Sequence, residues 1–121
     1  AIPMLRAAGT SPLHGRAIEA PDGLRPHDLS EAAAQGDTVS ADVLERAGMR
    51  LGVAVASAAN LLDITTFIVG GGIAAAGDIL FDAIRGSAAE RVLKVHRDHL
   101  TIIPAECGND AGMLGAASLL Y

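Results

Sequence analysis

A short β-branched run that stops at three consecutive glycines constrains this chain most. Residues 65–69 read Thr-Thr-Phe-Ile-Val, and Gly70-Gly71-Gly72 follow directly. β-Branched and aromatic side chains favour a strand, and a glycine cluster ends one. The length and composition of the run predict a strand that is buried on both faces, as in parallel sheets covered by helices.

Helical patterns flank this strand on both sides. Before the strand, we expect helices over 29–35 and from Asp37 or Ser40 to about Leu62. After it, we expect helices from about Ala76 to Arg85 and from Ser87 through Val95, then a second strand over Leu100–Pro104. A last helix is expected from Asp110 to about Leu120. Strand, crossover helices and strand in this order predict a right-handed βαβ unit with parallel strands. The fold class is therefore α/β. A sheet this thin indicates part of a larger α/β domain.

The start of the chain differs from the remainder. Four of the five prolines lie in residues 1–27, which predicts a connecting segment with at most a short helix near Ile2–Ala8. Residues 28–121 then form the folded part. Within it, residues 51–62 carry no charge and are mostly small. We expect that half of the long helix to be buried on every side.

Composition excludes several functional classes. The formal net charge is −5 and the cations are scattered, which argues against a nucleic-acid surface. Cys107 is the only cysteine, so this chain cannot form an internal disulfide or a Cys-based zinc site. The uncharged stretch 64–77 is too short and too rich in glycine to span a bilayer. We expect a cytoplasmic protein without membrane or direct nucleic-acid contact.

The glycine run is the candidate binding site, because ligands of parallel α/β sheets bind at the carboxyl ends of strands. Two interpretations stay open: contact with a nucleotide, or a tight corner without a ligand. A P-loop is excluded, since Ile73-Ala74-Ala75 stands where Lys and Ser or Thr are needed. A dinucleotide fingerprint is met in form by Gly70, Gly72 and Ala75. It lacks the acidic residue about 20 positions on and is rejected.

Other polar residues favour structural roles. His96 and His99 could share a helix face as metal ligands, but no third ligand is near, so a solvated helix end is preferred. Asp63 is expected to make turn or cap contacts. Asn109 or Asp110 is a natural N-cap of the last helix, which we prefer to a catalytic role for Asp110. We therefore predict no catalytic and no metal-binding residue in this chain.

Four segments in order resemble the C-terminal half of ROK proteins (repressor, open reading frame, kinase). They are residues 51–63, 67–74, 103–106 and 108–117. The resemblance implies the C-terminal part of the nucleotide-binding lobe of an actin-like, ribonuclease H-like ATPase fold, over residues 28–121. Family enzymes phosphorylate a hexose or N-acetylhexosamine with ATP and Mg²⁺. Gly70, Gly71 and Gly72 match the glycine loop that borders the adenosine part of ATP.

Family motifs that carry the chemistry have no counterpart in this chain. The Asp-x-Gly-Gly-Thr phosphate motif, the Asn-Asp pair with the catalytic base and the zinc segment are absent. We therefore expect the piece of a sugar kinase that follows the zinc segment, inactive alone and without bound ATP or Mg²⁺. The alternatives are the same piece of a ROK-type transcriptional repressor, or a scaffold half that has lost its ligand.

Two partners follow from these expectations. In the resembling family the final helix packs with the N-terminal lobe, which would be the first partner. Residues 111–121 carry no charge, so the isolated chain should expose an apolar helix. We expect it to form a homodimer through this C-terminal helix.

Overall fold

The computed structural model describes residues 11–15 and 21–119. The short helix considered near Ile2–Ala8 and the end of the last helix at Leu120 lie outside the described residues. The longer elements are α3 (Pro26–Ala34), α4 (Thr38–Leu62), β1 (Thr66–Val69), α5 (Asp78–Arg91), β2 (Thr101–Pro104) and α7 (Ala111–Ser118). Short turns of helix connect them: η1 (Pro21–Gly23), η2 (Gly72–Ala76), α6 (Lys94–Arg97) and η3 (Gly108–Asp110).

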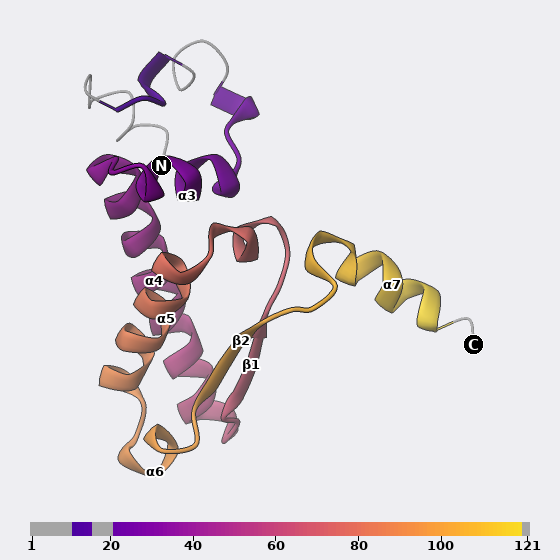
Figure 1. The fold of residues 1–121 in the computed structure, drawn as a ribbon. Helices are drawn as coiled ribbons and strands as arrows, with labels where there is room; N and C mark the ends of the chain where they lie inside the picture. The colour runs from indigo at the N-terminus through magenta and orange to yellow at the C-terminus, as the bar shows by residue number, and fades with distance from the viewer. Residues whose placement is uncertain (1–10, 16–20, 120–121) are drawn as a thin grey trace.

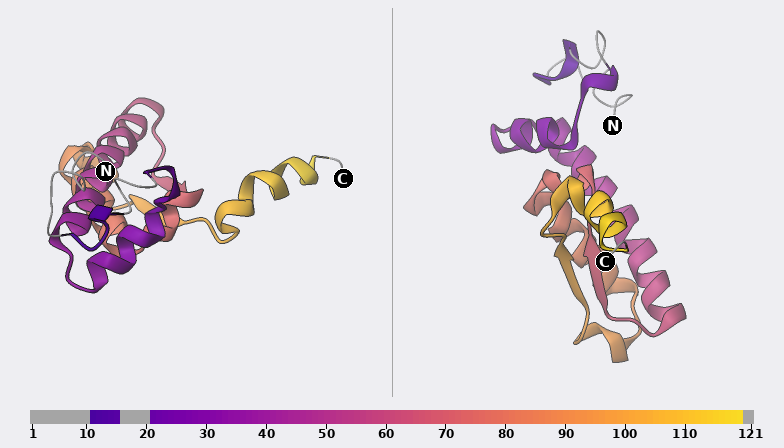
Figure 2. Two further views of the ribbon diagram at one scale, coloured as in Figure 1. Left: turned by 90° about the horizontal axis from the view of Figure 1, so that it is seen from above. Right: turned by 90° about the vertical axis from the view of Figure 1, so that its right-hand side faces the viewer.

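The two strands form the predicted parallel βαβ unit. β1 pairs with β2 in the register Phe67 to Ile102, and α5 and α6 lie between them in the chain (Figure 1). The helices α4 and α5 cover one side of this sheet, while α7 extends away from it (Figures 1 and 2). The α/β fold class is therefore confirmed.

Burial of β1 on both faces was a wrong prediction. Phe67 packs against the core, but Ile68 points to the other side and is 67% exposed. In β2 the same alternation buries Ile102 and exposes Ile103. One face of the sheet is thus covered by helices, and the other is open in the described part of the chain.

Small residues let α4 and α5 pack unusually closely. A Cβ atom on Gly48 would lie 2.6 Å from the backbone oxygen of Leu80, and one on Gly52 would lie 2.6 Å from that of Ile84. Side chains at these two positions would collide with backbone that cannot move aside. Glycine is therefore required at this helix crossing because of space.

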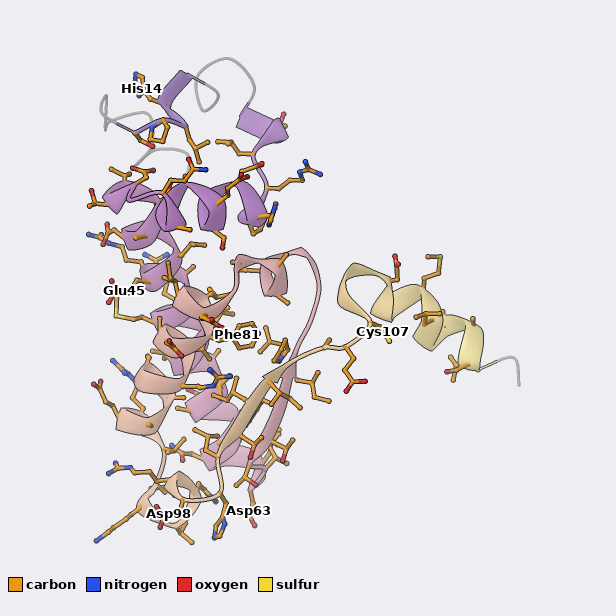
Figure 3. The ribbon with its side chains drawn as sticks, in the orientation of Figure 1. His14, Glu45, Asp63, Phe81, Asp98 and Cys107 are labelled. Atoms are coloured by element: carbon orange, nitrogen blue, oxygen red, sulfur yellow. The ribbon has the colours of Figure 1, made fainter. Side chains whose placement is uncertain are left out.

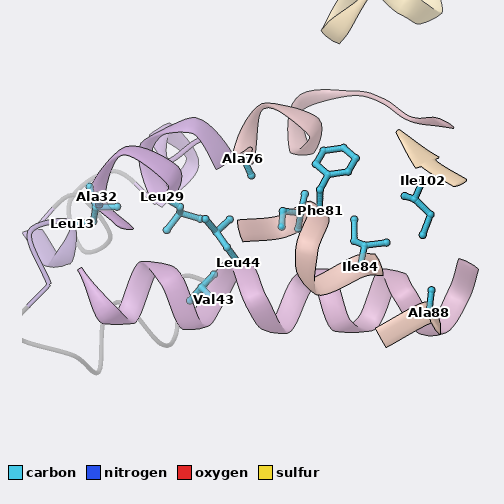
Figure 4. Packing of buried hydrophobic residues seen from close by; sticks show 11 residues of the cluster. Leu13, Leu29, Ala32, Val43, Leu44, Ala76, Phe81, Ile84, Ala88 and Ile102 are labelled. Atoms are coloured by element: carbon cyan, nitrogen blue, oxygen red, sulfur yellow. The ribbon is translucent and has the colours of Figure 1, made fainter. Parts of the chain in front are cut away.

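The core lies between α3, α4, α5 and the covered face of the sheet (Figure 4). Leu44, Leu80, Phe81 and Ile84 are among its large members. The second half of α4 contributes only one face, through Gly52, Ala56 and Ala59. The expectation that residues 51–62 are buried on every side is wrong, since Leu61 is 83% exposed. No helix among the described residues is long and apolar enough to cross a membrane.

Helix α5 is continuous where two helices were expected. It runs through Gly86 and Ser87, although Ser87 opens a capping-box pattern. The Ser87 hydroxyl instead donates to the backbone oxygen of Met49 on α4, at 2.7 Å. The Ser87 hydroxyl is therefore engaged in a tertiary hydrogen bond and does not cap a new helix.

Capping residues set the ends of α3 and α4. Helix α3 begins at Pro26, earlier than expected, and the Asp28 carboxylate accepts a hydrogen bond from the Arg25 N–H at 2.8 Å. Gly36, with φ 96°, ends it as predicted. Helix α4 begins after Asp37 and ends at Leu62, also as predicted, with Asp63 in the left-handed conformation.

The segment before α3 is anchored to the helices. The Ser11 hydroxyl donates to the Asp37 carboxylate at 2.8 Å, and the Ser40 hydroxyl donates to the same oxygen. Leu13 is 7% exposed and joins the core. Burial alone would raise the pKa of Asp37, but the hydrogen bonds from Ser40 and Ser11 outweigh it and lower that pKa below its ordinary value.

The outer edge of the sheet is covered at β2. The guanidinium of Arg85 donates two hydrogen bonds to the backbone oxygen of Ile102, at 3.0 and 3.3 Å. The same guanidinium lies 5.5 Å from the ring centre of Phe81. Arg85 thereby ties α5 to the strand that would otherwise present a bare carbonyl.

Candidate functional site

The glycine turn stands exposed at the carboxyl end of β1. Gly71 has φ 78°, a conformation that residues with a Cβ rarely adopt. A Cβ atom on Gly71 or Gly72 would have no protein atom within 4 Å. The space outside the turn is therefore open, and a planar or sugar ligand could approach the backbone directly.

The inner side of the glycine turn packs against the rest of the fold. Its chain continues into η2, where the Ala74 N–H donates to the Gly71 oxygen at 3.1 Å. Ala76, at the end of η2, is 1% exposed and lies in the core beside α3. Gly77 follows with φ 74°, and a Cβ on it would lie 3.6 Å from the Ser30 hydroxyl of α3. The outer surface is open while the base is packed, an arrangement suited to a preformed binding edge.

The end of β2 lies beside this turn. The Ala105 N–H donates to the Val69 oxygen at 2.9 Å, which extends the strand pairing to the glycines. A Cβ on Gly70 would lie only 3.3 Å from the Cβ of Ala105. Ala105 thus bounds the turn at Gly70, while Gly71 and Gly72 remain open. Sequence reasoning did not select Ala105, although parallel strands end at the same edge of a sheet.

The turn η3 follows and leads to α7. Gly108 has φ 52°, and the exposed thiol of Cys107 lies just before it (Figure 3). Asp110 occupies the N-cap position of α7 as predicted, but its side chain makes no capping hydrogen bond. The carboxylates of Glu106 and Asp110 are exposed at this edge.

The remaining candidates lie at the opposite end of the strands. His96 is only 7% exposed, so the expected solvated helix end is wrong for this residue. Its Nδ1 atom lies 3.6 Å from the carboxylate of Asp63, whereas His99 is exposed. Asp63 thus lies at the end of α4, and its carboxylate contacts His96. Within the described ranges, no group of three or more His, Cys, Asp or Glu side chains could hold a metal ion.

In the described part of the chain, the strand ends offer an open backbone edge and not a cluster of metal-binding side chains. The open glycine backbone leaves room for a ring, while no metal-binding cluster stands near it in the described part. The sequence profile of the ROK family matches residues 6–121. The chain belongs to the ROK family.

Relatives of this ROK chain include enzymes and repressors. It is 38% identical over 100 residues to a glucokinase of Streptomyces coelicolor, covering 82% of this chain and 32% of that protein. It is 27% identical over 113 residues to the DNA-binding transcriptional repressor Mlc of Escherichia coli, covering 93% of this chain and 26% of that protein. The chain therefore spans about a third or less of the length of these curated relatives.

The structure agrees with this assignment. A ROK family glucokinase of Streptomyces griseus, solved with glucose and AMPPNP, superimposes with a TM-score of 0.76 at 30% identity. The match covers 98% of this chain and 40% of that one. The expected fold, part of an actin-like α/β lobe, is confirmed.

Proposed function

We propose that this ROK chain forms the adenosine side of the active site of an ATP-dependent sugar kinase. The observation that carries the proposal is the open, positive-φ glycine turn at the end of β1, fixed from behind by η2 and α3. The similarity to glucokinases supports it, because one of them was solved with the ATP analogue AMPPNP. The whole protein would transfer a phosphoryl group from ATP to a hydroxyl of a hexose or N-acetylhexosamine.

Residues of the turn and of the neighbouring strand end have different tasks in this proposal. Gly71 supplies a backbone without a side chain, against which the ribose or the adenine can lie. The hydrogen bond from the Ala105 N–H to the Val69 oxygen holds the turn at the strand ends, and Gly70 leaves room for the methyl group of Ala105. ATP, when bound with Mg²⁺, supplies the phosphoryl group. Activation of the sugar hydroxyl requires a carboxylate placed against the sugar, which in this proposal comes from the rest of the protein.

The partner of this segment in the proposal is the N-terminal lobe of a longer protein. Helix α7 presents Met113 at 70% and Leu119 at 87% exposure, and it extends from the body towards the open side of the sheet (Figure 2). That lobe would cover this apolar helix. The free thiol of Cys107 fits the reducing cytoplasm, where we place the protein.

A second candidate is the sugar-sensing portion of a ROK repressor. The specific observation in its favour is the similarity to Mlc over 93% of this chain. The two candidates differ in the sequence that precedes this segment. An Asp-x-Gly-Gly-Thr phosphate motif there supports the kinase, and a helix-turn-helix supports the repressor.

Substitution of Gly71 tests the proposed nucleotide contact. In the longer protein, we expect Gly71→Val to weaken binding of AMPPNP by at least about tenfold, because two methyl groups fill the ligand space and disfavour positive φ. Titration calorimetry measures the affinity, and circular dichroism verifies folding.

Gly36→Val is the matched control. Gly36 has φ 96° and open surroundings, so valine there causes similar backbone strain away from the strand ends. We expect the control to lose stability but to keep its affinity. Equal affinities of the Gly71 variant and the parent protein would show that the glycines only form a corner.

A further inference from the structure

A hollow of about 380 Å³ lies along the outer edge of β2, a volume within the range of small-molecule sites. Its lining comes from α5, from β2 and from the short helix α6, which directly precedes β2 (Figure 1). Two arginines, Arg85 and Arg97, line it together with the apolar side chains of Ala89, Leu100 and Ile103. The described residues that line this hollow include no acidic side chain. It is therefore a cationic hollow with partly apolar walls.

Arg85 is fixed in position at this hollow. Its Nε and Nη2 atoms donate to the Ile102 oxygen at 3.3 and 3.0 Å, and its Nη1 atom donates to the Asp82 carboxylate at 3.3 Å. A guanidinium carries five N–H groups, so two of them remain available to a ligand. An anionic group in the hollow would thus meet donors that are already held in place, which lowers the entropy lost on binding.

Arg97 supplies a positive charge that has no partner. Within the described residues, its exposed side chain makes no ion pair or hydrogen bond. Asp82 offsets part of the charge of Arg85, so Arg97 contributes most of the attraction for an anion. The chain as a whole carries a formal net charge of −5, so a small anion is attracted only where cations gather locally.

The apolar walls restrict the kind of ligand. Ile103 is 42% exposed, and Leu100 and Ala89 are half-buried. Apolar surface beside guanidinium groups suits a molecule with an apolar body and one anionic group. An added peptide strand fits poorly, because Arg85 occupies the Ile102 oxygen and Pro104 has no N–H to offer. The occupant that matches both the charge and the shape is a small molecule.

We propose that this hollow binds a small organic acid, with a compact apolar body and one carboxylate or phosphate group. The guanidinium groups of Arg85 and Arg97 bind the anionic group, and the apolar body lies against Leu100 and Ile103. This proposal does not depend on nucleotide binding, because the lining residues of β2 precede the strand end at which the glycine turn lies.

Titration followed by NMR tests the site. Benzoate and phenyl phosphate are the anionic probes, and benzamide is the neutral probe of the same shape. The ¹⁵N-labelled full chain carries Leu114→Glu in every sample, which limits the association expected through α7. We expect either acid to shift the amide signals of Ala89 and residues 100–103, with a dissociation constant of about 1 mM. Benzamide should bind at least about tenfold more weakly, because it lacks the charge.

Arg97→Gln removes the free charge and keeps most of the side chain. We expect it to weaken binding of the acids by about fivefold or more. Arg50→Gln is the matched control, since Arg50 is also exposed and without an ion pair within the described residues, but lies on α4. The control should leave the affinity unchanged. Arg85 is not varied, because its loss would also release the Ile102 oxygen.

Circular dichroism verifies that both variants fold. Three results overturn the proposal: equal binding of benzamide and benzoate, parental affinity in Arg97→Gln, or amide shifts that lie outside the residues lining the hollow. Absence of shifts with both acids at about 20 mM overturns it as well, because a site of the expected affinity would then be nearly saturated.

Discussion

Gly48 and Gly52 determine how closely α4 and α5 approach. We expect Gly52→Ala to lower the free energy of unfolding by about 1–3 kcal/mol, because the new methyl group would lie 2.6 Å from the Ile84 oxygen. Urea unfolding measures the change. Gly86→Ala in α5 is the control, since a Cβ there has no atom within 4 Å. The control should be neutral or stabilising, and equal losses in both variants would contradict the crossing geometry.

Asp37 makes part of the stability depend on pH. Its pKa is lowered in the folded state by hydrogen bonds from Ser40 and Ser11, which outweigh the opposing effect of burial. Because its pKa is lower in the folded state, ionised Asp37 stabilises the fold at pH values above its unfolded-state pKa of roughly 4. This stabilisation is lost as the pH falls through the folded-state pKa. We expect Asp37→Asn to be less stable than the parent at pH 7, with a difference that shrinks towards pH 3. A constant difference in urea unfolding across this range would refute the role of ionisation.

The position of the glycine turn at a strand end could be predicted from residues alone, but its surroundings could not. Three glycines after a β-branched run mark a strand end, and strand ends bind ligands. The contact of Ala105 with Gly70 depends on the register of β2, which the sequence does not specify. His96 was misjudged because its charged sequence neighbours indicate solvent, whereas in the fold it is 7% exposed and lies 3.6 Å from Asp63, just past the end of α4.

At the scale of elements, helix α7 carries a prediction about association. Its described side chains include no charged group, and Met113 and Leu114 are 70% and 54% exposed. We expect the isolated chain to self-associate through α7, and Leu114→Glu to reduce that association because a buried carboxylate is costly. Sedimentation of both chains at increasing concentration measures the effect. If both are monomers at high concentration, α7 is already satisfied within the chain.

Element boundaries were predictable where a local cap decides them. Asp37 begins α4 and Gly36 ends α3, since each acts through its own backbone neighbours. The break expected at Ser87 failed because a hydroxyl can serve another helix as well as its own. The burial of β1 failed for a larger reason, because strand composition does not reveal how many faces the described chain itself covers.

At the scale of the whole molecule, we expect the chain alone to phosphorylate no sugar. It contains the proposed adenosine edge, but no phosphate motif of the family stands in its sequence. A coupled ATPase assay over a panel of hexoses and N-acetylhexosamines measures turnover. Addition of the glucokinase of Streptomyces coelicolor as a positive control establishes the sensitivity of the assay. Turnover that co-purifies with the chain would contradict this prediction.

The guanidinium of Arg85 makes the two edges of the two-stranded sheet unequal as sites for adding another strand. A new strand beside β2 would have to displace two hydrogen bonds from the Ile102 oxygen, and the next outward position, Pro104, offers no N–H. Among the described residues, no side chain binds the free edge of β1 in the way that Arg85 binds the edge of β2. Strand addition is therefore blocked on one side and permitted on the other. Such one-sided protection leaves only the β1 edge able to accept another strand and protects the β2 edge against edge-to-edge aggregation.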